Sequence, residues 1–360
     1  MKFITEKALI VDSLQNAAAV AERRQTIPIL ANLRLKIVDK KLEVTATDLE
    51  IQIKTYSDLI EIHEEGETTV SARKMSELCK SLPEGESVSF SLANGKLTVS
   101  SSNFHADFAT ISPDDFPEIE INEEQTPITV ESAVLKRILS KTSFSMASQD
   151  VRYYLNGMLL EIEGNKINGV ATDGHRLAFS SAKTNASDLD LRNILPRKAV
   201  LELAKLLSAS EGTIELLIGP TYVDVRSQNL NFSSKLIDGK YPDYDKVFPT
   251  GEPLPLEISK ELLQSALSRA SVLSNEKYRG VRFQLTENKL KLTANNPEQE
   301  SAEEELDVIY KGTELEVGFN IGYLLDVLNS IESETVCFEF YGEDSSCILK
   351  EQNSEDDIYV

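Results

Sequence analysis

The sequence predicts an α+β protein built from three tandem copies of one domain, each with two helices backed by antiparallel sheet. Three observations support this prediction: an internal repeat, two amphipathic helical runs in each copy, and strands of alternating hydrophobicity between those runs. The length agrees with it, because 360 residues exceed what one hydrophobic core usually serves.

The repeat is centred on the stretch from Tyr153 to Phe179, which has diverged copies on both sides. Ala-Thr-Asp or Ala-Asn elements begin at Ala46, Ala171 and Ala294, so the copies are offset by 125 and 123 residues. A unit of this length is a whole domain and is too long for a solenoid repeat. The domains that we expect from the repeat and from the linkers between its copies span residues 1–121, 127–250 and 253–360.

Each copy contains two runs with apolar residues at helical spacing. In the first copy the helices are expected from about Lys7 to Arg24 and from Ser71 to Leu82, with Ser71 as the N-cap and Pro83 as the stop signal. The corresponding helices in the other two copies are predicted at Ser132 to Met146, Pro196 to Ser208, Ser259 to Val272 and Asn320 to Ile331.

The segments between the helices alternate apolar and polar residues, which is typical of half-buried antiparallel strands. Leu33, Leu35 and Ile37 interleave with two cations, and the dipeptide Asn94-Gly95 predicts a hairpin turn. The order predicted for one copy is therefore βαβββ(β)αβββ.

The composition excludes several classes of protein. The net charge is −22, the three cysteines form no CxxC pair, and the three histidines have no metal-ligand spacing. We expect no metal site, no cofactor and no phosphate-cradling loop. The chain shows no membrane-length apolar run and no signal peptide, so we expect a cytoplasmic protein.

The charge is distributed unevenly, and this favours a polyanionic partner. The six predicted helices contain 14 basic and six acidic residues, although the chain as a whole is strongly acidic. Basic helix faces that line a concave surface would attract nucleic acid, whereas ordinary solvated helices would have no such role. The helix cations that we take as candidates for DNA contact are Arg24, Arg73, Arg137, Lys141, Arg197, Lys198 and Lys205. The last helix departs from the pattern, since its only charge is Asp326.

Six stretches together resemble the β subunit family of bacterial DNA polymerase III, the sliding clamps. They are MKF at the start, DVRYYLNGMLLE, VATDGHRLA, KLIDGKYPDY, LSNEKYRGVR and TANNPEQE. The resemblance runs from end to end. It implies three clamp domains in each chain, a head-to-tail homodimer that forms a ring, and duplex DNA passing through the ring without base readout.

The resemblance also assigns residues to the DNA and to the ring-closing edges. Gln149, Tyr153 and Tyr154 match family positions that touch DNA, as does Arg24. One edge is basic and apolar and the other acidic and apolar, so the two unlike ends of the chain would be complementary. The edge residues are Lys74, Lys96, His105 and Phe108 in the first copy, and Val272, Leu273, Glu298, Glu300, Glu303 and Glu304 in the third.

A pocket for partner peptides is implied on the second and third copies. Its apolar walls would receive leucine and phenylalanine anchors from the polymerase α subunit, the clamp loader and other clamp-binding proteins. The matching residues are Leu155, Thr172, Gly174, His175, Arg176, Leu177, Pro242, Lys246, Val247, Ser346 and Val360. Family chains continue past this point with a methionine- and proline-containing tail, and we expect such a tail to complete the pocket.

Two other functions are compatible with the same residues. Asp173 and His175 could act as an acid/base pair of a hydrolase, but no nucleophile is apparent beside them. Alternatively, the chain could be a peptide-binding scaffold that never encircles DNA. The Asp173-Gly174 dipeptide also predicts a tight turn, whatever the function.

Overall fold

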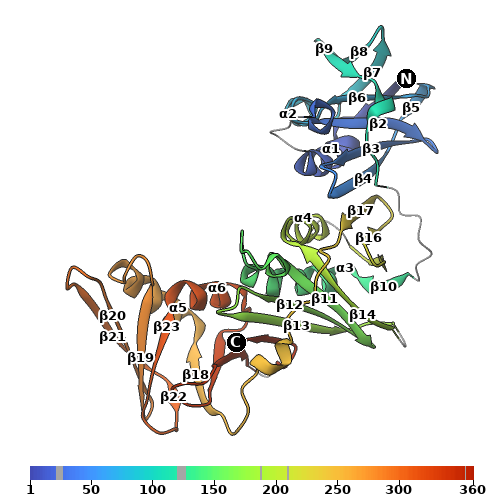
Figure 1. Ribbon diagram of the computed structural model, residues 1–360. Coiled ribbons are helices and arrows are strands. Elements are labelled where there is room, and N and C mark those ends of the chain that lie inside the picture. Colours follow the sequence, from blue (N-terminus) through green and yellow to red (C-terminus); the bar gives the residue numbers. More distant parts are fainter. Residues whose placement is uncertain (22–26, 120–126, 187–188, 209–210, 353) are drawn as a thin grey trace. The chain divides into compact units, whose positions relative to one another are not determined.

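The computed structural model describes residues 1–21, 27–119, 127–186, 189–208, 211–352 and 354–360 (Figure 1). It divides into two compact units, of which unit 1 comprises residues 1–135 and 198–237 and unit 2 comprises residues 136–197 and 238–360. The second copy of the repeat is thus shared between the units.

The order of elements matches the prediction in the second copy, whereas the first and third copies have five strands between their helices, one more than predicted. The first copy contains β1 (Lys2–Glu6), α1 (Lys7–Val20), β2 (Asn32–Val38), β3 (Lys41–Thr47), β4 (Ile51–Asp58), β5 (Glu61–Glu64), β6 (Glu67–Ser71), α2 (Ala72–Ser81), β7 (Ser87–Ala93), β8 (Lys96–Ser101) and β9 (Phe104–Ile111). The second contains β10 (Ile128–Glu131), α3 (Ser132–Thr142), β11 (Gly157–Gly164), β12 (Lys166–Thr172), β13 (Leu177–Lys183), β14 (Leu189–Pro196), α4 (Arg197–Leu207), β15 (Thr213–Ile218), β16 (Tyr222–Arg226) and β17 (Leu230–Lys235). The third contains β18 (Leu254–Ser259), α5 (Lys260–Val272), β19 (Gly280–Thr286), β20 (Lys289–Asn295), β21 (Ser301–Asp307), β22 (Ile309–Tyr310), β23 (Leu315–Asn320), α6 (Ile321–Ser330), β24 (Thr335–Phe340), β25 (Ile348–Glu351) and β26 (Asp357–Tyr359).

The six predicted helices are confirmed to within a few residues at their ends. The predicted end of the first helix, near Arg24, lies outside the described residues. Ser71 occupies the predicted N-cap position of α2, but its side chain accepts no hydrogen bond from the first turn of the helix. The hairpin at Asn94-Gly95 is confirmed, with φ of 51° and 71° at the two turn residues.

The sheets of unit 1 join into one continuous ladder of strands. The order is β10-β15-β16-β17-β4-β3-β2-β6-β9-β8-β7-β1-β5, and β17 of the second copy pairs antiparallel with β4 of the first. Helices α1 and α2 pack together against this ladder (Figure 1). Phe3 and Phe90 stack at 4.7 Å between ring centroids on neighbouring strands, and both are buried.

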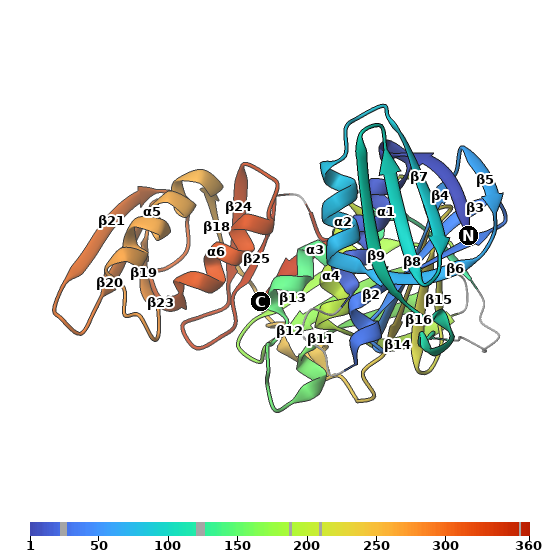
Figure 2. The same ribbon diagram turned by 90° about the horizontal axis from the view of Figure 1, so that it is seen from above.

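Unit 2 repeats the arrangement at the other junction between copies. Its larger sheet has the order β14-β11-β12-β13-β26-β25-β24-β18-β22, so the second copy joins the third through β13 and β26. A smaller sheet has the order β21-β20-β19-β23, and α5 and α6 lie side by side above the strands of the third copy (Figure 2). Between helices and strands lies an aromatic core in which the rings of Phe283 and Phe319 are 4.9 Å apart.

The close packing of α3 on β12 requires a glycine. A Cβ atom at Gly169 would lie 2.4 Å from Cγ2 of Ile138 on the helix, closer than any real contact. Alanine at this position would therefore push the helix away from the sheet.

The repeat is preserved in its hydrogen bonds. Thr47 Oγ1 donates to the carbonyl of Ile51 at 2.8 Å and accepts from the N–H of Leu49 at 3.0 Å. In the second copy, Thr172 Oγ1 donates to the carbonyl of Arg176 at 2.6 Å and accepts from the N–H of Gly174 at 3.0 Å. Each turn thus satisfies its own backbone with the same side chain, 125 residues apart.

Candidate functional site

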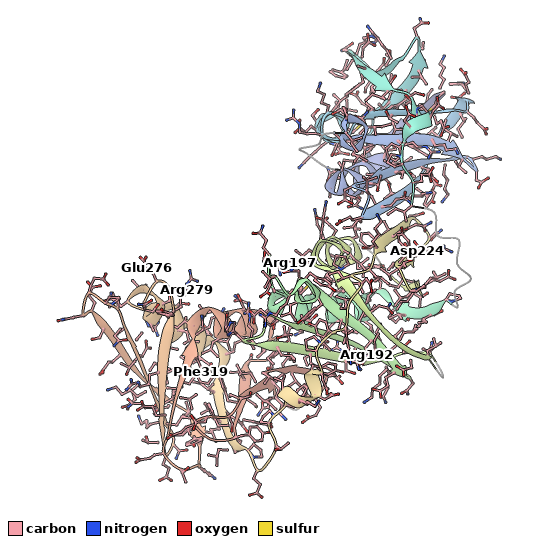
Figure 3. All side chains as sticks on the ribbon, viewed as in Figure 1. Arg192, Arg197, Asp224, Glu276, Arg279 and Phe319 are labelled. Atoms are coloured by element: carbon pink, nitrogen blue, oxygen red, sulfur yellow. The ribbon has the colours of Figure 1, made fainter. Side chains whose placement is uncertain are left out.

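A cavity of about 390 Å³ lies in unit 2, between the turn that precedes β13 and the elements of the third copy. Its lining combines apolar and aromatic side chains with a few polar ones, as that of ligand sites usually does. The lining residues come from five segments: Ser145; His175, Arg176 and Leu177; Val317, Gly318, Phe319, Asn320, Tyr323, Leu324 and Val327; Glu343, Asp344, Ser345, Ser346, Cys347 and Leu349; and Tyr359 and Val360. Phe319, on β23, is labelled in Figure 3.

The last residues of the chain form one wall of this cavity. Val360 and Leu177 exchange two backbone hydrogen bonds, of 2.8 and 2.9 Å, which extend the pairing of β13 with β26. Leu177 and Tyr359 are buried beneath the wall. The sheet that joins the second and third copies therefore also shapes the cavity.

Arg176 is held in place on every side. Its Nη1 lies 2.6 Å from the Asp326 carboxylate on α6, and its Nε lies 3.2 Å from that of Asp173. Nη2 donates to the carbonyl of Phe144 at 2.8 Å, and the guanidinium carbon lies 4.3 Å from the ring centroid of Tyr323. This fork geometry is characteristic of arginine, and it ties the turn of the second copy to the last helix.

The carboxylate of Asp173 stabilises the turn. One oxygen of its carboxylate accepts hydrogen bonds from the backbone N–H groups of His175 and Arg176, at 2.9 and 3.1 Å. Gly174 has a φ of +89°, which other residues rarely adopt. The predicted tight turn is confirmed, and both oxygens of the Asp173 carboxylate are bonded within the turn.

Burial raises the pKa values of three titratable groups that line the cavity. Burial raises the pKa of the Cys347 thiol and of the Tyr359 phenol. Burial and the neighbouring carboxylate of Asp173 raise the pKa of Tyr323. All three groups are therefore neutral near pH 7, so they contribute polarity without charge.

The structure brings five of the eleven predicted pocket residues together around this cavity. They are His175, Arg176, Leu177, Ser346 and Val360. Thr172 and Gly174 belong to the adjoining turn, Leu155 is buried, and Pro242, Lys246 and Val247 are exposed outside the cavity. Lys246 forms an ion pair of 2.7 Å with Asp243.

The sequence prediction missed the larger part of the lining. Val317 and Phe319 on β23 and Tyr323, Leu324 and Val327 on α6 supply the aromatic and aliphatic wall. One signal was available, because the last predicted helix lacks the cations of the other five.

The predicted DNA residues fall into exposed and internally bonded groups. In unit 1, Arg73 and Lys205 are exposed, and Lys198 lies 2.5 Å from the Asp48 carboxylate. In unit 2, Gln149 and Tyr153 are exposed and Tyr154 is half-buried. Arg24 lies outside the described residues.

Three of the predicted DNA residues are bound within unit 2. Lys141 is buried and contacts Glu351 at 2.8 Å, which corrects the expectation that its charge faces outward. Arg137 donates to both oxygens of the buried Asp357, at 2.7 and 2.8 Å, so its charge is neutralised within the protein. Arg197, labelled in Figure 3, donates to the carbonyl of Met146 at 2.9 Å. Helical spacing did not separate these cations from the exposed ones, because their partners lie far away in sequence.

The predicted edge residues lie on three strands, on two helices and in the loop that precedes β21. Lys96, His105 and Phe108 are on β8 and β9 of unit 1, and Lys74 is exposed on α2. Val272, 78% exposed, and Leu273 end α5 in unit 2, while Glu298 and Glu300 precede β21 and Glu303 and Glu304 lie on it. Glu303 pairs with Lys291 at 2.9 Å and Glu304 with Arg269, so two of the four carboxylates are neutralised within the chain.

No described helix has the length and apolarity needed to cross a membrane. Within the described part of the chain, no group of three or more His, Cys, Asp or Glu side chains could hold a metal ion.

Comparison with known proteins gives the family. Models of the DNA polymerase III β subunit match residues 1–120 with the N-terminal domain, 129–243 with the central domain and 245–360 with the C-terminal domain. The chain belongs to the DNA polymerase III β subunit family. The predicted resemblance is thereby confirmed.

Relatives match over the full length. The β sliding clamps of Salmonella typhimurium and Escherichia coli are 43% and 42% identical, over 100% of this chain and 98% of each relative. A crystal structure of the Pseudomonas aeruginosa sliding clamp bound to griselimycin superposes with a TM-score of 0.97 at 42% identity, covering 100% of this chain and 98% of that one. The Caulobacter crescentus β subunit has a TM-score of 0.92 at 31% identity, with the same coverage.

Membership decides between the functions left open by the sequence. Proteins of this family are non-catalytic processivity factors, so the hydrolase alternative is wrong. The structure agrees with this conclusion, because both oxygens of the Asp173 carboxylate are hydrogen-bonded within the turn. The fold is the expected one, with α+β clamp domains and antiparallel sheets.

Proposed function

We propose that two copies of this chain close head to tail into a ring around duplex DNA and tether the replicative polymerase to it. The observation that carries the proposal is the end-to-end match to three clamp domains in order, with a TM-score of 0.97 to a sliding clamp. The division at residues 1–121, 127–250 and 253–360 remains a proposal. A protein with this role acts beside the bacterial chromosome, so we place it in the cytoplasm.

Two sheet edges support head-to-tail closure. β21 is the outermost strand of the smaller sheet of unit 2, and its backbone can accept a further strand. In unit 1, β6 pairs only with Thr110 and Ile111 of β9, so the stretch from Phe104 to Ala109 has β8 as its one described ladder partner. An unlike pair of edges repeated by a two-fold axis gives a closed ring. Exposed Lys74 and Lys96 would then face the acidic edge near Glu298.

DNA would be held topologically and without base readout. The candidate contacts that remain exposed, such as Arg73 and Lys205, are scattered cations suited to phosphates. A weak, salt-dependent attraction of this kind permits sliding, whereas specific base contacts would stop it.

The cavity beside Arg176 would bind the partners' peptides. Its aromatic and aliphatic lining suits leucine and phenylalanine side chains. The guanidinium of Arg176, held by Asp326, adds a fixed polar group to that lining. The griselimycin complex of a relative supports a ligand-binding role for such clamps. The partners that we propose are the DNA polymerase III α subunit, the clamp loader and other clamp-binding proteins.

The test is primer extension by the polymerase and clamp loader of the source organism on a singly primed circular template. Addition of this chain should lengthen the products made in one binding event. Products of unchanged length at saturating chain concentration would refute the proposal.

A further inference from the structure

Strand β23, Leu315–Asn320, has a free edge. It is the outermost strand of the smaller sheet of unit 2, and within the described part of the chain it pairs only with β19. The backbone N–H and C=O groups on the outer side of such a strand have no partner in the sheet, so they can bind a further strand. What lies beside this edge therefore decides whether a ligand can reach it.

The free edge of β23 borders the cavity beside Arg176. Four consecutive residues of the strand, 317–320, line that cavity. Successive side chains of a strand point to opposite faces of the sheet, so a cavity that touches four residues in a row runs along the edge of the strand and not along one face. The free edge and the cavity are therefore parts of one surface.

The register of β23 shows which of its backbone groups point outward. The N–H of Ile321 donates to the carbonyl of Arg279 at 2.8 Å, and Gly318 lies opposite Arg282 in the same register. Hydrogen-bonded and non-hydrogen-bonded positions alternate along an antiparallel pair. Because Ile321 is hydrogen-bonded across the pair, Phe319 is too, and Gly318 belongs to the other set. The N–H and the C=O of Gly318 therefore point away from β19, toward the free edge.

Gly318 also leaves this edge open. The residue is exposed, and a Cβ atom added to it would meet no atom within 4 Å beyond its chain neighbours. No described strand other than β19 and no described loop pairs with its backbone. An unpaired donor and an unpaired acceptor thus stand side by side at the edge of an apolar cavity, which is the pattern that an extended peptide recognises.

We propose that a partner peptide binds in extended conformation along the free edge of β23, so that its backbone exchanges hydrogen bonds with Gly318 while its anchors enter the cavity. The inference rests on the peptide-binding role proposed above and adds the conformation of the peptide to it. Hydrogen bonds between main chains supply affinity whatever the sequence, and pockets for the side chains supply selectivity. One cavity can then serve partners that share only their apolar anchors.

The test compares Gly318→Pro with Gly318→Ala. Proline removes an N–H that points away from β19, so the hydrogen bonds between β19 and β23 remain, and edge strands tolerate proline for this reason. Alanine keeps the N–H and fits into open space. Calorimetry with a synthetic peptide that carries leucine and phenylalanine anchors should show binding weakened about 5- to 20-fold in Gly318→Pro. In Gly318→Ala the affinity should stay within about 2-fold of that of the unaltered chain.

A second measurement needs no variant. Hydrogen exchange of the unaltered chain, followed by mass spectrometry, should slow in the segment that contains β23 when the same peptide is added at saturation. The matched control is β21, the opposite edge of the same sheet, where exchange should not change because none of its residues lines the cavity. Equal affinity of the proline and alanine variants, or unchanged exchange in β23, would overturn the inference and leave the cavity as the peptide site. Failure of the unaltered chain to bind the peptide would refute the peptide-binding role itself.

Discussion

The buried Lys141 forms an ion pair with the half-buried Glu351, with 2.8 Å between Nζ and Oε1, that joins α3 to β25. Lys141 also donates to the carbonyl of Ser330 at 2.6 Å, and the same Glu351 oxygen accepts from the N–H of Glu332 at 3.1 Å. Beside this pair, β25 pairs with β26, whose neighbour Val360 lines the cavity. The ion pair therefore stabilises the wall where ligands are expected.

Replacement of Glu351 by Gln should destabilise the chain by about 1–3 kcal/mol at pH 7, because it leaves the buried Lys141 with a single carboxylate partner, the exposed Glu332 at 3.4 Å. Chemical denaturation followed by circular dichroism measures the change. The control is Glu355→Gln, since Glu355 is exposed and pairs at the surface with Lys350. A destabilisation no larger than that of the control would contradict this role of the ion pair.

The same pair should give a pH dependence of known sign. Burial alone would raise the pKa of Glu351, but the hydrogen bonds from Lys141 and from backbone N–H groups outweigh it and lower the pKa below 4.5. A lowered folded-state pKa contributes stability that is present above the unfolded value of 4.5 and is lost as pH falls through the folded value. The stability difference between the unaltered chain and Glu351→Gln should thus be constant above about pH 5 and shrink in more acidic solution. If the stability difference instead grew as the pH fell, the pKa of Glu351 would be raised in the folded chain, and this prediction would be wrong.

Ring closure should weaken when both edges are altered. Lys74→Glu introduces the wrong charge on one edge, and Leu273→Ala removes apolar surface from the other, where the adjoining Val272 is 78% exposed. Sedimentation velocity at low micromolar concentration should show monomers for the double variant and dimers for the unaltered chain. Lys246→Glu, an equal charge change away from both edges, should remain dimeric. A dimeric double variant would mean that the edges are wrongly assigned.

Direct affinity for DNA should be weak and should fall steeply with salt. Arg73→Gln together with Lys205→Gln removes two exposed cations, and for each cation that binds a phosphate its removal should reduce the slope of log K against log salt by about 0.9. Fluorescence anisotropy on duplexes of unrelated sequence measures both the affinity and this slope. Lys246→Gln should leave the slope unchanged. A preference among the duplex sequences would contradict binding through phosphates alone.

Partner binding should depend on the aromatic wall. Tyr323→Ala removes a ring that packs on Arg176 and lines the cavity, and should weaken binding of a leucine- and phenylalanine-bearing polymerase peptide by about 2 kcal/mol. Leu177→Lys should abolish binding and leave the dimer intact, but it places a charge at a position only 2% exposed, so Tyr323→Ala is the more selective variant. Calorimetry measures both. Leu262→Ala, at an exposed position on α5 outside the cavity, is the control. Unchanged affinity in Tyr323→Ala would exclude this cavity as the peptide site.

The sequence predicted the repeat, the helices and the turn at Asp173, because each depends on neighbouring residues or a fixed period. It could not predict that Lys141 is buried, since its partner Glu351 is 210 residues away and helix periodicity shows only which face a residue occupies. The contribution of Phe319 and Tyr323 to the cavity has a similar cause. From sequence alone, both residues would be assigned to the core of the third copy. Only the structure shows that the turn at His175, in the second copy, lies beside them.

The central claim is that the chain encloses DNA in a ring, and retention on circular against linear DNA tests it most directly. Labelled chain is loaded by the clamp loader onto nicked circles, then passed through a gel-filtration column at high salt, before and after a restriction enzyme linearises the circles. The account predicts that the chain stays with circles and dissociates from linear DNA with free ends, because topology and not affinity holds it. Equal retention on both forms, or equal dissociation from both, would contradict it.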